Sequence, residues 1–185
     1  NGAQGFPRRV RSNNSLASVS NVTGNGINAY DIQQTFWKTY MAVDPISART
    51  VFTNAGNYVY WSQDSGNNWT RMNSAPFNKI AGKMTVNRLG TVVYAPTKDT
   101  SQRLMRFHWA YAQWSLTNKS AGLPQDRQVK RVHPSTRNLN WAYAVINGIG
   151  DNQKVFKTTD AGDAWTNITG NLPDIPVNDV LDDYD

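Results

Sequence analysis

The sequence predicts an all-β protein built from repeated four-stranded units, and three observations support this. All 13 acidic residues are aspartate, so the chain contains no glutamate, which is a good helix former. Asparagine occurs 21 times and glycine 13 times, beside 7 tryptophans and 8 tyrosines, a composition typical of strands joined by tight turns. A short motif also recurs along the 185 residues, at intervals of about 45 to 51 residues.

The recurring motif has the pattern Ser/Thr-x-Asp-x-Gly-x-x-Trp. Its two clear copies comprise Ser62, Asp64, Gly66 and Trp69, and Thr158, Asp160, Gly162 and Trp165. A degraded copy lies between them and ends at Trp114, without the aspartate and the glycine. A weaker fourth copy is expected upstream, anchored at Val19.

The residues that flank each copy repeat as well. An alternating strand, a Pro/Asn turn, a second strand with an aromatic end and a third strand precede each motif, and a short strand follows. Val43-Asp44-Pro45 aligns with Val132-His133-Pro134, which predicts that Asp44 and His133 cap equivalent turns. A four-stranded unit of roughly 40–50 residues has the size of a β-propeller blade.

The chain is therefore expected to be a single β-propeller segment of about three full blades and two partial ones. The predicted units are a partial blade 1–30, blades 31–78, 79–124 and 125–173, and the start of a next blade 174–185. Propellers typically close with 4–8 blades. Three explanations follow: a piece of a larger propeller, which is favoured, an assembly of several copies, or a small closed propeller.

The motif resembles the Asp-box, or BNR repeat, of sialidase, xyloglucanase-like, sortilin-type and photosystem-assembly propellers. The string after Trp165 also resembles large secreted repeat proteins of Bacteroidetes-type bacteria. The resemblance implies that the boxes lie on the rim, away from an active centre. Aspartate accepts backbone hydrogen bonds in tight turns, glycine tolerates positive φ, and tryptophan buries a large surface, so the eight residues of the two clear copies are predicted to be structural.

Catalytic residues are not predicted. The resemblance implies that a sialidase needs an arginine triad, a tyrosine activated by glutamate and an aspartate, and this chain has no glutamate. The string Phe6 to Arg9 matches the arginine-bearing sialidase motif only loosely. A xyloglucanase-like enzyme uses two aspartates as acid and base, for which the candidates are Asp31, Asp44, Asp99 and Asp126.

Ligand binding has one candidate, the aromatic-rich stretch of the degraded copy. Arg106, His108, Trp109 and Tyr111 are expected to form a platform on which sugars stack. The alternative interpretation is that these residues only alter the packing between blades.

Charge and composition exclude several classes of function. The net charge is +6, yet residues 174–185 hold five aspartates and no lysine or arginine. The basic residues are scattered, which predicts no nucleic-acid partner.

Cysteine is absent, and no metal or cofactor is predicted. The longest apolar run, 141–146, is too short to insert into a membrane. No function is predicted for the five Asn-x-Ser/Thr sequences, which begin at Asn13, Asn21, Asn68, Asn118 and Asn167.

The sequence thus favours a non-enzymatic module of a secreted or cell-surface bacterial-type protein whose leader is already absent. Such a module presents a rigid surface to a glycan or a protein, and the remaining blades come from the same parent chain or from other copies. The alternative is part of a sialidase- or xyloglucanase-like glycoside hydrolase with catalytic residues partly outside this chain. A third interpretation is a receptor or assembly-factor propeller that binds a peptide.

Overall fold

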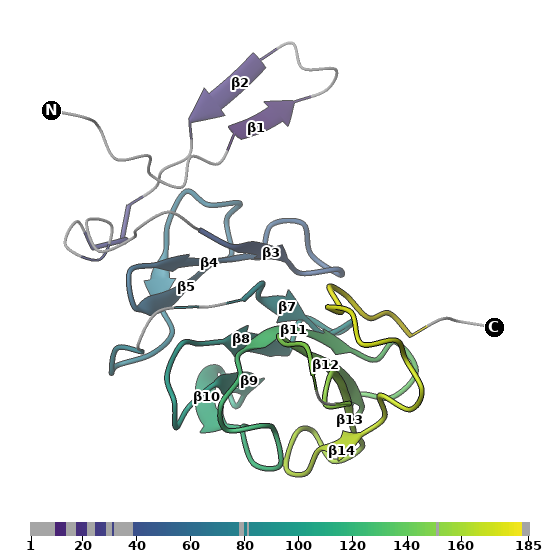
Figure 1. Ribbon diagram of the computed structural model, residues 1–185. Coiled ribbons are helices and arrows are strands. Elements are labelled where there is room, and N and C mark those ends of the chain that lie inside the picture. Colours follow the sequence, from purple (N-terminus) through teal and green to yellow (C-terminus); the bar gives the residue numbers. More distant parts are fainter. Residues whose placement is uncertain are drawn as a thin grey trace, which may run out of the picture.

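The computed structural model describes residues 10–13, 18–21, 25–28, 31, 39–77, 80, 82–150 and 152–182, and it confirms the all-β fold class. A hairpin pairs β1 (Val10–Asn13) with β2 (Ser18–Asn21). Three four-stranded antiparallel sheets follow it along the chain, as Figure 1 shows. In the part of the chain that the structure describes, no helix is long and apolar enough to cross a membrane.

Each sheet is a meander in which consecutive strands pair. The first sheet comprises β3 (Met41–Val43), β4 (Val51–Ala55), β5 (Tyr58–Ser62) and β6 (Thr70–Arg71). The second comprises β7 (Thr85–Val86), β8 (Val92–Pro96), β9 (Leu104–Ala110) and β10 (Gln113–Asn118). The third comprises β11 (Val129–Pro134), β12 (Ala142–Ile146), β13 (Val155–Thr158) and β14 (Thr166–Asn167). The predicted limits of the repeats remain predictions, whereas the four-stranded units themselves are observed.

The second strand of each sheet lies in the core. All five residues of β4 and all five of β8 are buried, because these strands are covered on both faces. Successive side chains of a strand point to opposite faces, so Val93 joins the core between the first and second sheets, and Tyr94 joins the core between the second and third. Fully burying a side chain such as Phe52 or Phe107 contributes about 1.5–3 kcal/mol. These two apolar layers hold the three sheets together.

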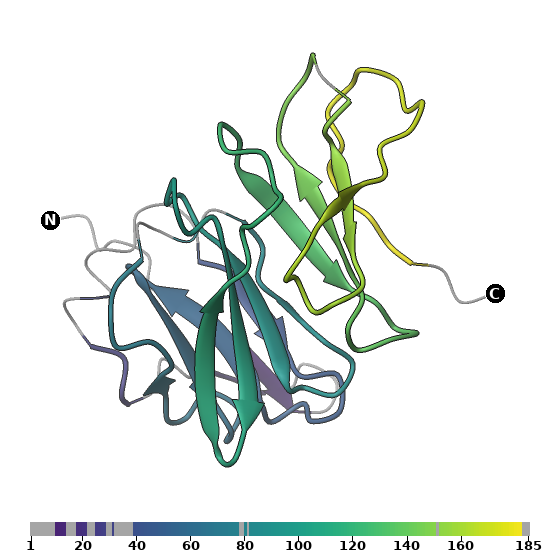
Figure 2. The ribbon, with the colours of Figure 1, turned by 90° about the horizontal axis from the view of Figure 1, so that it is seen from below.

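The first strands of successive sheets lie side by side. β3, β7 and β11 are neighbours in Figure 1, and β7 contacts both β3 and β11. The Thr85 hydroxyl donates a hydrogen bond of 2.6 Å to the carbonyl of Val132, and Lys83 forms a parallel bridge with Arg131. Figure 2 shows the third sheet inclined to the second, in the manner of adjacent propeller blades.

Contacts between neighbouring sheets recur at nearly constant separation along the chain. The hydrogen bonds Thr85–Val132, Trp165–Lys119 and Ser135–Asp182 join residues 47, 46 and 47 positions apart. The second and third sheets, and the third sheet and the C-terminal segment, therefore meet through residues about one structural repeat apart.

The acidic C-terminal segment lies along β11. Arg131 forms an ion pair with Asp179, and the Ser135 hydroxyl donates a hydrogen bond to the Asp182 carboxylate. The Lys130 ammonium donates a hydrogen bond to the side-chain oxygen of Asn178, which lies 48 residues further along the chain. The segment occupies the side of β11 opposite β7, where a further inner strand would lie, and its charge is matched by the basic residues of β11. The prediction that residues 174–185 open another blade remains a prediction.

Candidate functional site

The turn between β5 and β6, which we name the Asp64 turn (Ser62–Trp69), is closed by short side-chain hydrogen bonds. The Ser62 hydroxyl donates to Asp64 Oδ1 at 2.8 Å and accepts from the Gly66 amide at 2.8 Å. Asp64 Oδ1 also accepts from the amide of Asn68 at 2.8 Å. Gly66 has a φ of 91°, a conformation that glycine adopts without strain.

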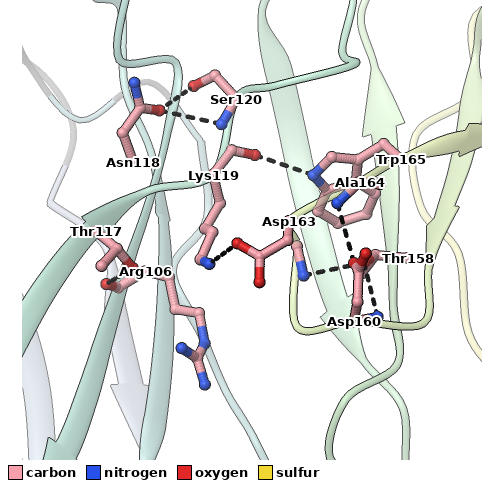
Figure 3. Close-up of polar contacts among 11 residues, drawn as sticks. Arg106, Thr117, Asn118, Lys119, Ser120, Thr158, Asp160, Asp163, Ala164 and Trp165 are labelled. Carbon is pink, nitrogen blue, oxygen red and sulfur yellow. Dashed lines mark hydrogen bonds and ion pairs between the residues drawn. The ribbon is translucent and has the colours of Figure 1, made fainter.

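The turn between β13 and β14, the Asp160 turn (Thr158–Trp165), has the same hydrogen bonds. The Thr158 hydroxyl donates to Asp160 Oδ1 at 2.7 Å and accepts from the Gly162 amide at 2.9 Å. The Ala164 amide completes the turn by donating to Asp160 Oδ1 at 3.0 Å. Figure 3 shows this arrangement. In both turns the aspartate accepts hydrogen bonds from amides of its own loop, and the structural role predicted for these residues remains a prediction.

The hydrogen bonds shift the acidity of both carboxyl groups. Donation by the Asn68 amide, then by the Asn68 and Ser62 side chains, lowers the pKa of Asp64 to about 2. The Ala164 amide and the Thr158 hydroxyl likewise lower the pKa of Asp160. Both groups are therefore ionised at neutral pH.

These shifts predict how stability depends on pH. Because the folded pKa of each aspartate lies below the unfolded value near 4, each carboxylate stabilises the fold above about pH 4. That contribution is lost as the pH falls through the folded pKa. We expect the free energy of unfolding, measured by urea titration, to drop between about pH 4 and pH 2. The double variant Asp64→Asn/Asp160→Asn should show a shallower drop, and an equally steep one would contradict the assignment.

The tryptophans that end both turns anchor one sheet to the preceding part of the chain. Trp69 and Trp165 are each 7% exposed. The Trp165 indole donates a hydrogen bond of 2.9 Å to the carbonyl of Lys119, which follows β10, as Figure 3 shows. The Lys119 ammonium in turn pairs with Asp163 of the Asp160 turn. The Trp69 amide donates to the carbonyl of Asn25 at 2.8 Å.

The third predicted anchor, Trp114, is wrong in register. The pairs Trp61–Thr70, Lys157–Thr166 and Arg106–Thr117 are equivalent in the three sheets. The residue before each threonine is Trp69, Trp165 and Leu116, so Leu116 holds the anchor position. Trp114 lies two residues earlier because β9 and β10 continue into a longer hairpin. Val19, the fourth predicted anchor, lies in β2, where the structure gives only its backbone pairing with Ser12.

The hairpin extension ends in a two-residue turn with unusual residues. Tyr111 and Ala112 have φ values of 51° and 61°, the conformation that two-residue hairpins normally assign to Asn-Gly. Tyr111 is 99% exposed at this tip. Figure 2 shows the hairpin projecting beyond the neighbouring loops. The chain thus holds an aromatic side chain in solvent on a strained turn.

Three tryptophans gather where this hairpin meets the first sheet. The ring centroids of Trp61 and Trp109 lie 4.9 Å apart, those of Trp109 and Trp114 lie 5.2 Å apart, and those of Trp61 and Trp114 lie 5.5 Å apart. Each tryptophan is partly exposed. We call these residues the tryptophan cluster. It combines β5 of one sheet with β9 and β10 of the next.

The four residues of the predicted sugar platform are divided between two faces of the second sheet. Trp109 lies on the face toward the first sheet, within the tryptophan cluster. Arg106 and His108 alternate with Trp109 along β9, so they lie on the opposite face. Leu104 is on that same face and belongs to the core shared with the third sheet. Burial and the charge of Arg106 lower the pKa of His108, so this imidazole is neutral at pH 7. The structure brings Trp109 together with Trp61 and Trp114 rather than with Arg106 and His108.

A pocket of about 200 Å³ adjoins the tryptophan cluster. One wall is Trp61, a member of the cluster, and the other lining residues are polar: Ser62, Gln63, Asp64, Asn68 and Thr70. Thr70 pairs with Trp61 across β5 and β6, and residues directly opposite share one face of a sheet. The pocket therefore opens on the same side of the first sheet as the cluster.

The aspartates considered as an acid and base pair are engaged elsewhere. Asp44 accepts a hydrogen bond from the amide of Ile46, and Asp99 accepts from Ser101 and Gln102 in the turn before β9. Asp126 lies in the connection to β11, 3.6 Å from Arg127, and the buried Asp31 receives the hydroxyl of Tyr60. No group of three or more potential metal ligands occurs among the described residues.

The predicted equivalence of His133 and Asp44 is wrong by two residues. Asp44 and Ser135 each begin a turn, because their amides donate to Thr50 and Trp141 and their side-chain oxygens accept from the amide two positions on. His133 lies inside β11, opposite Tyr143. Ser135 is therefore the turn residue, and the shared Val-x-Pro pattern was misleading.

One repeated device was not recognised in the sequence. Asn73, Ser120 and Thr169 are buried, and each accepts a hydrogen bond from the amide that starts the third strand of its sheet. The acceptor distances are 2.8 Å, 3.0 Å and 3.0 Å. Two of these residues end the Asn-x-Ser/Thr sequences at Asn118 and Asn167, whose side-chain oxygens accept from the same residues. Those sequences were the available signal.

A buried cation beside this device was also missed. Lys154 is fully buried just before β13, and its ammonium lies 2.9 Å from the carbonyl of Pro173 and 2.7 Å from Asp174 Oδ1. Arg103, which precedes β9, donates similarly to the carbonyl of Gln125. Each cation thus holds the segment that follows the last strand of its own sheet.

No protein-family model matches the sequence, and no curated protein sequence matches it significantly. Solved structures do match in fold. A GH74 enzyme from Niastella koreensis matches with a TM-score of 0.50 and 19% identity over 70% of this chain and 22% of its own. An ancestral GH74 enzyme matches with a TM-score of 0.53 and 20% identity over 69% of this chain and 19% of its own. The GH74 xyloglucanase of Xanthomonas campestris matches with a TM-score of 0.50 and 19% identity over 73% of this chain and 24% of its own.

This chain thus spans about a fifth to a quarter of the length of these three GH74 structures. At such low identity the similarity concerns the fold. Together with the three four-stranded sheets and their adjacent first strands, it shows that the chain is a segment of a β-propeller.

Proposed function

We propose that this chain is a non-enzymatic segment of a larger Asp-box propeller of a secreted or cell-surface protein, and that its tryptophan cluster binds carbohydrate. The observation that carries the proposal is the position of three partly exposed tryptophans from two sheets beside a polar pocket. The Asp64 and Asp160 turns, with identical hydrogen bonds, support the Asp-box assignment.

The chemistry of the site suits a sugar. Indole rings offer a broad, rigid apolar surface, which packs against the C–H face of a pyranose ring. Hydroxyl, amide and carboxylate groups lie within the adjoining pocket, at Ser62, Gln63 and Asp64. A few polar groups beside an aromatic wall fix the orientation of a small ligand. Tyr111 is a further exposed aromatic residue, at the tip of the hairpin that carries Trp109 and Trp114.

The absence of catalysis in this segment is inferred from the engagement of its carboxylates. Asp64 and Asp160 close their own turns, and Asp44 and Asp99 do the same between strands. Glycoside hydrolysis requires two carboxyl groups placed on either side of one bond. The remaining candidate, Asp126, lies 3.6 Å from Arg127, so no two of these aspartates are proposed as an acid and base pair.

Replacing Trp109 with alanine is expected to weaken glycan binding about tenfold, a loss of roughly 1.4 kcal/mol. Removing this ring takes away one face of the stack while leaving the Asp64 turn intact. Isothermal titration of the 185-residue chain with cellohexaose and with a xyloglucan oligosaccharide measures the effect.

Trp141→Ala is the matched control for this variant. Trp141 is also a partly exposed tryptophan, but it lies beside Lys157 of the third sheet, with the ammonium 3.8 Å from the ring centroid. Its loss should leave affinity unchanged. Equal losses in both variants, or no binding by the unmodified chain, would contradict the proposal. Cleavage of the oligosaccharide would favour the glycoside hydrolase alternative, and capture of a peptide at the same residues would favour the receptor alternative.

A further inference from the structure

The pocket beside the tryptophan cluster carries a negative charge on its wall. Asp64 is the one charged residue among the described residues that line it, and neither lysine nor arginine is among them. The remaining polar walls are the neutral side chains of Ser62, Gln63, Asn68 and Thr70. A ligand that enters this space therefore meets a negative charge without a compensating cation in the wall.

The Asp64 carboxylate keeps this charge at any physiological pH. Its Oδ1 accepts from Ser62 and from the Asn68 amide, and its Oδ2 accepts from the Asn68 side chain at 2.6 Å. These donors lower its pKa to about 2. The donors hold the carboxylate in a fixed orientation, and a carboxylate retains further lone pairs that only accept hydrogen bonds. Sugar hydroxyls can donate to them, whereas a carboxylate or sulfate of a ligand cannot.

We propose that this site selects uncharged glycans and rejects those that carry carboxylate or sulfate groups. The inference rests on the proposed function, since it names the ligand class of the same site. It follows from the placement of Asp64 beside Trp61 and from the absence of a cation among the described lining residues. Like charges that meet at a few ångströms repel, and the repulsion weakens as salt is added. Selection should therefore be strongest at low ionic strength.

The test compares two ligands that differ only in the group at C6, a neutral hydroxymethyl group in one and a carboxylate in the other. Cellohexaose and a β-1,4-linked glucuronic acid hexamer share linkage and length, but each ring of the second carries a carboxylate. Isothermal titration at low salt should show affinity at least about tenfold higher for cellohexaose. The difference should shrink as salt increases from about 20 mM to 300 mM.

Gln63→Lys adds a cation at an exposed position of the pocket wall, at a residue that makes none of the side-chain hydrogen bonds described above for the Asp64 turn. It should reduce the preference for cellohexaose at least about threefold, and Gln63→Met is the control that changes size without adding charge. Failure of both ligands to bind would overturn the proposed function. Equal affinity of the unmodified chain for both would overturn the charge selection alone, as would a preference that Gln63→Lys leaves unchanged.

Discussion

Replacing Trp165 with alanine is expected to lower the free energy of unfolding by about 3–5 kcal/mol, because the variant removes a large side chain from the boundary between two sheets. Trp165 is 7% exposed and belongs to the core shared by the second and third sheets. The change also leaves the carbonyl of Lys119 without the indole donor that lies 2.9 Å from it. Urea denaturation followed by circular dichroism measures the loss.

Two variants separate packing from hydrogen bonding at this position. Trp165→Phe keeps an aromatic ring but removes the donor, so it should cost about 1–3 kcal/mol, less than alanine. Trp141→Ala removes a partly exposed tryptophan from the same sheet and should cost less than either. If Trp165→Ala and Trp141→Ala lower stability equally, Trp165 does not anchor the third sheet.

Replacing Lys154 with alanine is expected to cost about 2–5 kcal/mol, the usual effect of truncating a long side chain at a fully buried position. The side chain is fully buried, and its ammonium joins the carbonyl of Pro173 to the carboxylate of Asp174. Alanine leaves a cavity in place of the long stem and a carbonyl without its donor. Thermal and urea unfolding of the 185-residue chain give the change.

Lys154→Met is the matched variant, since it keeps the apolar stem and removes only the charge. Replacing a buried ion by a well-packed apolar side chain is often close to neutral, so methionine should restore at least half of the stability lost with alanine. Asp174→Asn tests the other side of the pair, because it leaves the buried ammonium without its anion. Near-native stability of Lys154→Ala would show that the connection after β14 is held by other contacts.

The parts of the structure that depend on short stretches of sequence could be predicted. In the Asp64 and Asp160 turns, every defining hydrogen bond joins residues no more than four positions apart. A local motif therefore contains all the information that the turn needs. The repetition of these motifs, with strands of the right length between them, was sufficient to predict four-stranded units.

The register of strand pairing was harder to predict, because a sequence pattern does not show how far a strand continues. Tyr111 and Ala112 form a turn that usually requires Asn-Gly, so the hairpin extension was hidden and Trp114 took the place of Leu116. A tryptophan at nearly the expected interval outweighed a leucine at the correct position. In β11 the proline of a shared Val-x-Pro pattern similarly concealed Ser135.

The candidate site depended on contacts between sheets, which no local pattern reveals. Trp61 lies just outside the motif that begins at Ser62, yet it is the residue that links the pocket to Trp109 and Trp114. Lys154 was missed for a different reason. Lysine is almost never fully buried unless it is paired, and its partners are supplied by a connection whose path the sequence does not specify.

The nearly constant separation of the contacts between sheets has a consequence for how the chain folds. Each sheet forms from consecutive strands, and the bonds of the third sheet to the second sheet and to the C-terminal segment reach only 46 to 48 residues along the chain. Loop closure over such short distances costs little entropy, so folding can begin in any one sheet and spread to its neighbours, as in other repeat proteins. In the 185-residue chain on its own, the second sheet is packed between two others, so its amides are expected to be the slowest to exchange hydrogen.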